Sequence, residues 1–492
     1  MTRMMLGLRF RSVIVLAVLA SLVFVESIAL LDQILFPNYQ LMFGSVFLQL
    51  SKGLFWAFAP FSAVLLLMLI FVLPLRYLLD LGGRRSELIF RFHRWISRPL
   101  APIMRLLSEQ IGERNISWRL QITLLASTLL STSAFGLTPY RPDLNPQGNL
   151  VGVDTTNYST LVGNMLAKSA TDAVHYSFVD PIFNGSRPFA LLFLYVISTL
   201  SGTNASSALR LAPALLAPLL AGTCFIFVQC GLGDRRAAVL AALLSVCSYQ
   251  VSVGIWAGYY ANWLALVESY LFLTSVLLFT KTRSRTLFAS MLITSVALLF
   301  THPWTWTMMV ALVALLALDS CIKKNGTVPW RPIIFLLATN IGVDLARIFL
   351  IGSYSGEQAG YDVARGASPF NILQVWPNTV GVFAYYDGYL ANALYLGLSL
   401  LAVLGLYRSK NEFSRVLVLW TAMVALPFIF LSSLLESRLV YVAPVSILAV
   451  IGVLKLETGL GRLQGILLMA FVVLLGANAA MQTVVQLVAV PG

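Results

Sequence analysis

The chain has 492 residues, of which 59% are hydrophobic and only 11% are charged, and its mean hydropathy is +0.84. Soluble domains carry roughly 25% charged residues, so a soluble core of this length cannot hide so much apolar surface. The formal net charge of +13 does not indicate a nucleic-acid partner, because the basic residues fall in short clusters between apolar runs, as in cytoplasmic loops. The composition therefore predicts an all-α, multi-pass membrane protein.

Fourteen apolar runs approach the roughly 20-residue length that spans hydrocarbon. They lie near residues 12–34, 54–79, 120–138, 188–202, 207–230, 236–254, 259–280, 287–301, 304–320, 332–351, 387–407, 416–433, 439–455 and 463–485. The first run follows three arginines and shows no clear small-residue cleavage site, so it is predicted to be an uncleaved first helix.

The positions of Lys and Arg favour thirteen spans over fourteen. If the run 188–202 does not span, 25 of the 33 Lys and Arg residues fall on one side, as the positive-inside rule requires. If it spans, the basic loops after residue 230 fall outside. The run is short and begins at Pro188, which suits a helix on the outer leaflet. We predict thirteen spans, a cytoplasmic N-terminus, an extracytoplasmic C-terminus and a plasma-membrane location.

This topology divides the chain into two predicted parts. Residues 1–118 form an accessory module of two spans and a basic amphipathic segment, which is expected to lie on anionic membrane lipids. Residues 119–492 form the main transmembrane domain, with long outer loops at 139–206 and 352–386. Long loops in compact proteins are usually functional or disordered.

The residues that could carry chemistry collect on the predicted outer face. There is no Walker loop, no GxGxxG after a strand and no HExxH motif. Instead, Asp154 follows the third run and opens the stretch Asp-Thr-Thr-Asn-Tyr158, with Asn-Met-Leu further on. Asp172, Asp180 and the segment Ser-Arg187-Pro188 come next.

This order of motifs resembles the first outer loop of GT-C glycosyltransferases, in the protein O-mannosyltransferase and aminoarabinose transferase branch. The resemblance continues in Ala-Leu-Arg210-Leu-Ala-Pro213 and Gly-Asp234-Arg-Arg. Near the C-terminus, Glu-Ser-Arg438-Leu-Val-Tyr441 is similar to the Arg-x-x-Tyr start of a late helix in that branch. The resemblance as a whole covers roughly residues 119–460. It depends on the order and spacing of several loose motifs taken together.

The resemblance implies a membrane enzyme that moves a sugar from a polyprenyl- or dolichyl-phosphate carrier to an acceptor protein or glycolipid. Asp154 matches the catalytic acid of the family, and a carboxylate suits activation of an acceptor hydroxyl or amide. Arg438 and His302 are candidates to bind the donor phosphate, for which arginine is well suited. The substrate-binding candidates are Tyr158, Arg187, Tyr259 and Tyr260.

One position departs from the family pattern. The branch usually has two adjacent acids, whereas Thr155 stands in the second place here. Asp180 or Asp172 are candidates for the second acid, as in relatives that hold a divalent metal between separated carboxylates. No cofactor is required by the sequence, and metal dependence stays open.

Two other functions are kept as alternatives. A transporter or lipid flippase is suggested by Glu268 and Asp344, because an ionisable residue within a span is costly and usually functional. Asp344 and Arg347 are three residues apart and are expected to pair, whereas Glu268 and Glu26 have no obvious local partner. Thr155 also allows an inactive relative that serves as a scaffold.

Overall fold

The computed structural model describes residues 2–36, 116–322, 330–351, 389–406, 409, 411–425, 439 and 441–489. All regular structure in these residues is helical. Eight of the described helical segments are long and apolar enough to cross a membrane, namely Ser12–Leu35, Trp118–Tyr140, Ala205–Leu232, Arg235–Ala257, Tyr260–Thr282, Pro303–Cys321, Trp330–Leu350 and Arg462–Val485. The predicted all-α, multi-pass membrane class is therefore confirmed. The second predicted span and the basic segment before residue 116 lie outside the described residues.

The chain divides into two compact units. The first comprises residues 1–114 and 368–482, and the second comprises residues 115–367 and 483–492. The N-terminal segment thus shares a unit with the C-terminal helices, a grouping that the sequence does not predict. The predicted division at residue 118 stays a prediction.

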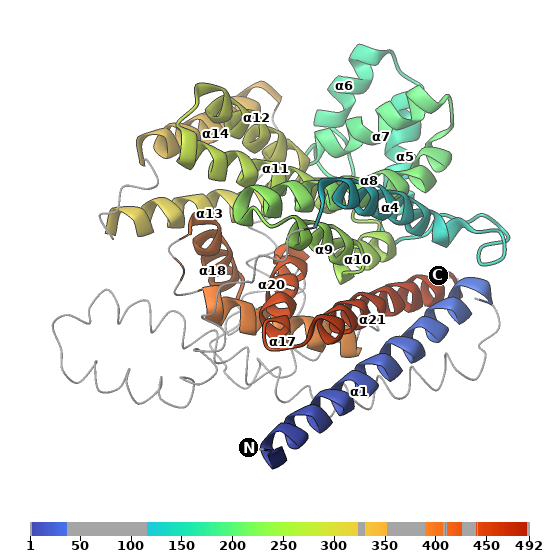
Figure 1. Cartoon of the computed structure of the whole chain (residues 1–492). Helices are drawn as coiled ribbons and strands as arrows, with labels where there is room; N and C mark the ends of the chain where they lie inside the picture. Colours follow the sequence, from blue (N-terminus) through green and yellow to red (C-terminus); the bar gives the residue numbers. More distant parts are fainter. Residues whose placement is uncertain are drawn as a thin grey trace, which may run out of the picture. The chain divides into compact units, whose positions relative to one another are not determined.

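In the first unit, helix α1 (Thr2–Leu35) packs against helix α21 (Arg462–Ala489) in parallel (Figure 1). The Gln464 amide donates to the Ser12 hydroxyl at 2.9 Å, and the Asn478 amide donates to the Glu26 carboxylate at 2.5 Å. Both pairs are separated by 452 residues, so the two helices run in the same direction. Glu26, which has no partner nearby in the sequence, is thus paired across this interface.

The other described helices of the first unit are α17 (Tyr389–Leu406), α18 (Glu412–Ala425) and α20 (Val445–Glu457). Helices α17 and α20 approach closely, because a side chain on Gly452 would lie 2.3 Å from the Leu398 carbonyl oxygen. The Tyr395 hydroxyl donates to the Val472 carbonyl of α21 at 3.0 Å. These helices lie at the predicted runs 387–407, 416–433 and 439–455.

The second unit contains α4 (Trp118–Leu137), η1 (Thr138–Tyr140), α5 (Thr155–Leu166), α6 (Ala170–Phe178), α7 (Pro188–Ser201), α8 (Ala205–Leu232), α9 (Arg235–Val246), α10 (Tyr249–Ala257), α11 (Tyr260–Thr282), α12 (Arg285–Thr301), α13 (Pro303–Ile322) and α14 (Trp330–Ile351). Helix α8 packs against α4, α9 and α11, and α11 packs against α12.

Two prolines inside α8 leave two backbone carbonyls without their helical hydrogen bonds, and neighbouring helices supply the missing donors. A proline lacks the N–H that would bond the carbonyl four residues earlier, so Pro213 and Pro218 release the carbonyls of Leu209 and Ala214. The Ser133 hydroxyl of α4 donates to Ala214 at 2.9 Å, and the Tyr260 hydroxyl of α11 donates to Leu209 at 3.4 Å. Both released carbonyls therefore accept bonds from neighbouring helices, as a membrane interior requires.

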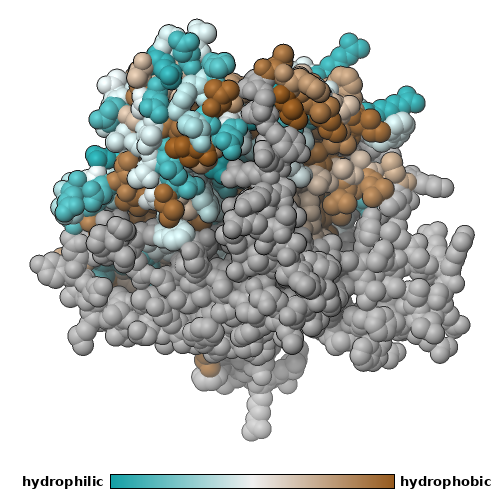
Figure 2. Space-filling view, turned by 180° about the vertical axis from the view of Figure 1, so that it is seen from behind, coloured by the Kyte–Doolittle hydropathy of each residue, from teal (hydrophilic) through white to brown (hydrophobic). Residues whose placement is uncertain are grey.

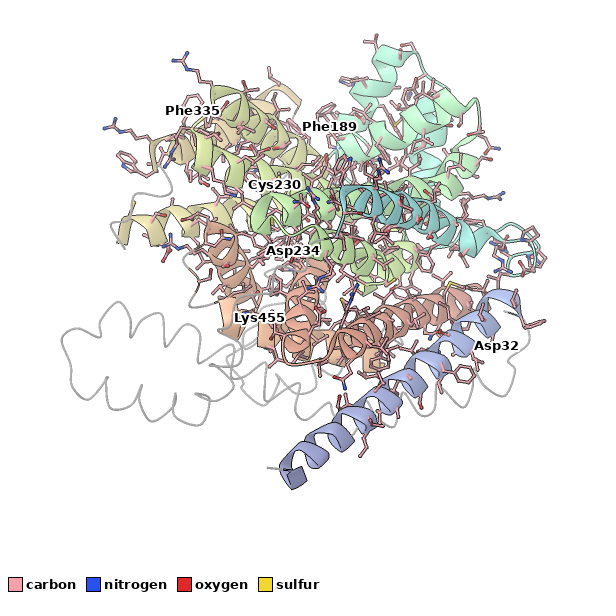
Figure 3. The ribbon with its side chains drawn as sticks, in the orientation of Figure 1. Asp32, Phe189, Cys230, Asp234, Phe335 and Lys455 are labelled. Atoms are coloured by element: carbon pink, nitrogen blue, oxygen red, sulfur yellow. The ribbon has the colours of Figure 1, made fainter. Side chains whose placement is uncertain are left out.

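Helices α8 and α11 are also parallel, which defines two ends of the second unit. Tyr260 of α11 contacts Leu209 of α8, and the Lys281 ammonium donates to the Cys230 carbonyl at 2.9 Å, both pairs 51 residues apart. The end at Lys281 also holds Arg235, which donates to the Ile116 carbonyl, and Figure 3 shows Cys230 and Asp234 near each other there. We call it the basic end, and the end at Tyr260 the site end.

Breaks in the helices follow local chemistry. The predicted run 236–254 is divided at Cys247 and Ser248, where the Ser245 and Ser248 hydroxyls donate to carbonyls three residues back, a competition that weakens helix bonding. Helix α12 ends at Thr301 because His302 precedes Pro303 and takes an extended backbone.

Candidate functional site

Helices α5, α6 and α7 lie together at the site end of the second unit (Figure 1). Hydrophilic side chains gather over this part of the molecule in the opposite view (Figure 2). Exposed residues there include Thr156, Thr160, Asn164, Lys168, Asp172 and His175. The end of α4 and the start of α8 both lie at this end of the unit, because the Tyr260 hydroxyl bonds both Tyr140 and Leu209.

The backbone of Asp154 is held by the end of α10. The amide of Val153 donates to the Trp256 carbonyl at 3.2 Å, and the amide of Asp154 donates to the Ala257 carbonyl at 2.9 Å. Gly258 allows this approach, because its φ is +66° and a side chain there would lie 2.5 Å from the Thr155 hydroxyl. Asp154 is the N-cap residue of α5, but its side chain makes no capping hydrogen bond. The backbone of Asp154 is thus fixed, and the residue is partly buried.

Arg187 lies at the centre of the candidate site. It precedes α7, is only 9% exposed, and donates through Nη1 to the Tyr158 hydroxyl at 3.2 Å. Its guanidinium carbon lies 4.6 Å from the centroid of the Phe183 ring, which itself packs on Tyr158. Asp154 and Tyr259 also interact electrostatically with this guanidinium. Two of the predicted site residues, Tyr158 and Arg187, are therefore in direct contact, and Asp154 and Tyr259 act on the same guanidinium electrostatically.

The charges at this cluster follow from burial. Burial raises the pKa of the Tyr158 phenol, although the nearby Arg187 partly opposes the shift. Tyr158 is therefore a neutral hydroxyl at neutral pH. Burial disfavours the charged form of Arg187, but its interactions with Tyr158, Asp154 and Tyr259 outweigh burial and raise its pKa above the usual value. Arg187 is therefore a permanent cation that interacts electrostatically with Asp154.

Tyr260 packs against the Tyr158 side chain of this cluster. It is buried and packs its ring on Tyr158 at 5.5 Å between centroids. Its hydroxyl lies 3.4 Å from the Thr155 hydroxyl and donates to the Leu209 carbonyl. This geometry gives Tyr260 a place in the packing of α5, α8 and α11, whereas Tyr259 is more exposed and lies beside Arg187.

Thr155, which stands where GT-C glycosyltransferases usually have a second acid, packs against Gly152, Gly258 and Tyr260. It is fully buried, and its hydroxyl donates to the Val151 carbonyl at 2.8 Å. The same hydroxyl touches the positions where side chains on Gly152 and Gly258 would lie. An acid at this position would therefore lie in a packed interface.

The substitution Thr155→Asp is therefore expected to destabilise the protein and not to improve it. A charge buried without a partner costs several kcal/mol, so the midpoint of thermal unfolding in detergent should fall clearly below that of the wild type. Thr155→Ser keeps the hydroxyl that donates to Val151 and is the matched control. A Thr155→Asp variant with wild-type stability would contradict this account.

The two candidates for the second acid have structural partners. Asp172 is exposed on α6 and accepts a hydrogen bond from the Ser169 hydroxyl at 2.6 Å, next to the cap that Ser169 provides. Asp180 is 1% exposed and accepts from three backbone amides. Burial raises the pKa of Asp180, and these amides and Arg187 oppose the shift. No group of three potential metal ligands occurs in the part of the chain that the structure describes.

The two donor-phosphate candidates differ in what can be said of them. His302 is buried at the turn between α12 and α13, where its Nδ1 lies 2.7 Å from the Thr305 hydroxyl and accepts from the Thr305 amide at 3.3 Å. It therefore caps α13 at the site end. Arg438 and the loop 352–386 lie outside the described residues, so the role of Arg438 stays a prediction.

Two ionisable residues within apolar helices have distinct surroundings. Glu268 accepts a hydrogen bond from the Thr301 hydroxyl at 2.8 Å, and its second oxygen is buried with no hydrogen-bond partner among the described residues. Arg347 interacts electrostatically with Asp344, as the sequence predicts, but its guanidinium donates to the Gly185 carbonyl. The contact of Arg347 with Gly185 could not be predicted from the sequence, because it joins residues 162 positions apart.

No protein-family model matches this chain, and no curated protein sequence matches it significantly. The resemblance to GT-C glycosyltransferases is therefore carried by the sequence motifs alone.

Proposed function

We propose that this chain is a GT-C type integral membrane glycosyltransferase that takes its sugar from a polyprenyl- or dolichyl-phosphate carrier. The observation that carries the proposal is the buried pair of Arg187 and Tyr158 at one end of a membrane helix bundle, with Asp154 at the start of the helix that carries Tyr158. The family motifs place an acid, an aromatic and a basic residue in this order. The fold brings the same residues together although they come from three separate segments.

The proposed chemistry divides the work between Asp154 and the cations. Asp154 accepts the proton of an acceptor hydroxyl or amide, whose heteroatom then attacks the anomeric carbon of the sugar. The bond between this carbon and the carrier phosphate breaks, and the phosphate keeps the electron pair. Arg438 is proposed to neutralise the leaving phosphate, and Arg187 with Tyr158 to hold the Asp154 carboxylate in place. Tyr259 offers its ring to the sugar.

We also propose the thirteen-span topology with the N-terminus in the cytoplasm. Successive spans alternate in direction, so a parallel first and last span require an odd number of spans. The parallel pairing of α1 and α21 supports thirteen and disfavours fourteen. The return of the chain to Tyr260 on both sides of residues 141–208 supports a non-spanning α7, and the cations at the basic end support a cytoplasmic location for that end.

Cysteine labelling tests this topology. In a background with the four native cysteines replaced by serine, Asn184→Cys in the turn before α7 and Ser201→Cys at the last residue of α7, both exposed positions, should both react with an impermeant maleimide in intact cells. Arg283→Cys at the basic end should react only after permeabilisation. Labelling of only one end of α7 in intact cells would show that α7 crosses the membrane and would exclude thirteen spans.

A transporter or flippase is the second candidate, because Glu268 lies within α11 and one of its carboxyl oxygens is buried with no hydrogen-bond partner in the part of the chain that the structure describes. Proteoliposomes that hold no acceptor separate the two functions. A glycosyltransferase needs the acceptor to consume the donor, whereas a transporter moves labelled donor across the bilayer without one. Movement of donor that is abolished by Glu268→Gln and unaffected by Asp154→Asn would support the transporter and contradict our proposal.

A further inference from the structure

The segment between α6 and α7, residues 180–187, carries Arg187 into the site. Its shape is imposed by the buried carboxylate of Asp180, which accepts from the amides of Ile182 at 3.1 Å, Phe183 at 2.5 Å and Gly185 at 2.9 Å. A carboxylate that accepts three amides within five residues closes a tight turn. Two residues later the chain reaches Arg187.

The turn also needs an unusual backbone at its tip. Asn184 and Gly185 both have positive φ, +50° and +63°. A side chain on Gly185 would lie 1.8 Å from the Phe178 carbonyl oxygen, so only glycine fits between the turn and the end of α6. The carbonyl of Gly185 accepts a hydrogen bond from outside the turn.

Arg347 of α14 holds this carbonyl. Its Nη2 donates to the Gly185 oxygen, across 162 residues of sequence. The guanidinium is buried and lies 5.3 Å from the centroid of the Phe300 ring of α12. Asp344 and Asp180 also attract it electrostatically. Phe300 packs in turn on Phe178 of α6 and on Phe189, the second residue of α7 (labelled in Figure 3).

Asp180 thus shapes the turn from within, and Arg347 fixes it to α12 and α14. Arg347 lies near the end of α14. The residues that follow it, Phe349 and Leu350, are apolar and strongly exposed. The cation of Arg347 does not belong to the exposed apolar surface of α14. Its hydrogen bond is with the turn, at the Gly185 carbonyl. The side chain of Arg187 leaves the same turn in the direction of Tyr158.

We propose that Asp180 and Arg347 are positioning residues that set the place of Arg187, so that α14 controls the position of the cation in the site. The inference builds on the proposed function and adds positioning residues to its site, because Arg347 reaches the turn across 162 residues of sequence. Any change that shifts α14 moves the Gly185 carbonyl, and with it the cation beside Asp154.

Hydrogen–deuterium exchange on the full chain in nanodiscs tests the structural part without any activity. Arg347→Gln should raise amide exchange in the peptide that covers residues 180–187 at least about tenfold, with exchange in α8 and α11 unchanged. Arg331→Gln, at the exposed start of α14, is the matched control and should change nothing there. Asp180→Asn, which keeps one acceptor oxygen, provides a milder second variant. Wild-type exchange in both Arg347→Gln and Asp180→Asn would overturn the proposal.

A double-mutant cycle tests the coupling to Arg187. If Arg347 acts through Arg187, the variant Arg347→Gln/Arg187→Lys should transfer sugar no more slowly than Arg187→Lys alone, and Arg347→Lys should recover part of the loss seen in Arg347→Gln. Losses that multiply would show that Arg347 does not act through Arg187. If exchange rises as expected but no chain, wild type included, transfers sugar, the turn is held as described and the proposed function is the part that fails.

Discussion

Replacing Asp154 with asparagine is expected to abolish sugar transfer while the protein still folds. The change removes the only group that we assign to accept the acceptor proton, and loss of such a group lowers the rate about 10²–10⁴-fold. The fold should survive because Asp154 is held through its backbone amide, which donates to Ala257, and its side chain does not cap α5. The measurements are the initial rate of transfer and the thermal unfolding midpoint.

The control for Asp154 lies in the same outer segment. Asp172 is an exposed acid on α6 that bonds Ser169, so Asp172→Asn should keep nearly full activity. If Asp154→Asn transfers sugar at the wild-type rate, the catalytic role fails. If Asp172→Asn is as inactive as Asp154→Asn, Asp154 is not the distinguishing acid of this loop.

Removing the charge of Arg187 is expected to impair both folding and transfer. Arg187→Leu leaves the Tyr158 hydroxyl without its donor and takes the cation away from Asp154. Breaking a buried charged interaction costs about 3–5 kcal/mol, which should appear as a lower unfolding midpoint. Arg187→Lys keeps the charge but loses the planar stacking on Phe183. Its unfolding midpoint should therefore stay closer to that of the wild type than the midpoint of Arg187→Leu, while its rate of transfer still falls.

Arg141 supplies the comparison for a cation that matters little. It forms an ion pair with Asp143 at 2.6 Å in which both side chains are substantially exposed, and exposed pairs contribute about 0–1 kcal/mol. Arg141→Leu should therefore leave both unfolding and transfer nearly unchanged. Equal effects of Arg141→Leu and Arg187→Leu would contradict the central place that we give to Arg187.

Local signals in the sequence predict much of the helical framework. The run predicted at 188–202 is the helix Pro188–Ser201, because Pro188 starts it and Gly202, in a left-handed conformation, ends it. The boundary at His302 follows from Pro303 in the same way. These limits depend on residues that are neighbours in the chain, so hydropathy and turn chemistry suffice to find them.

The partners of buried polar groups could not be predicted in this way. Glu26 is paired with Asn478 across 452 residues, and Arg347 reaches Gly185 across 162. Sequence spacing paired Arg347 with Asp344, yet spacing says nothing about the carbonyl that a tight turn presents to another helix. Thr155 is similar, because only the packing shows that its side chain contacts Tyr260 and the two glycines.

The most direct test of the account is sugar transfer by the purified wild-type chain in liposomes. Radiolabelled sugars on polyprenyl and dolichyl phosphates would be supplied one at a time together with a membrane extract as acceptor. We predict that with at least one donor the label moves from the carrier to an acceptor in the wild type, and that it stays on the carrier in Asp154→Asn. If label remains on every carrier with the wild type, or if the wild type and Asp154→Asn transfer it equally, the chain is not the glycosyltransferase that we propose.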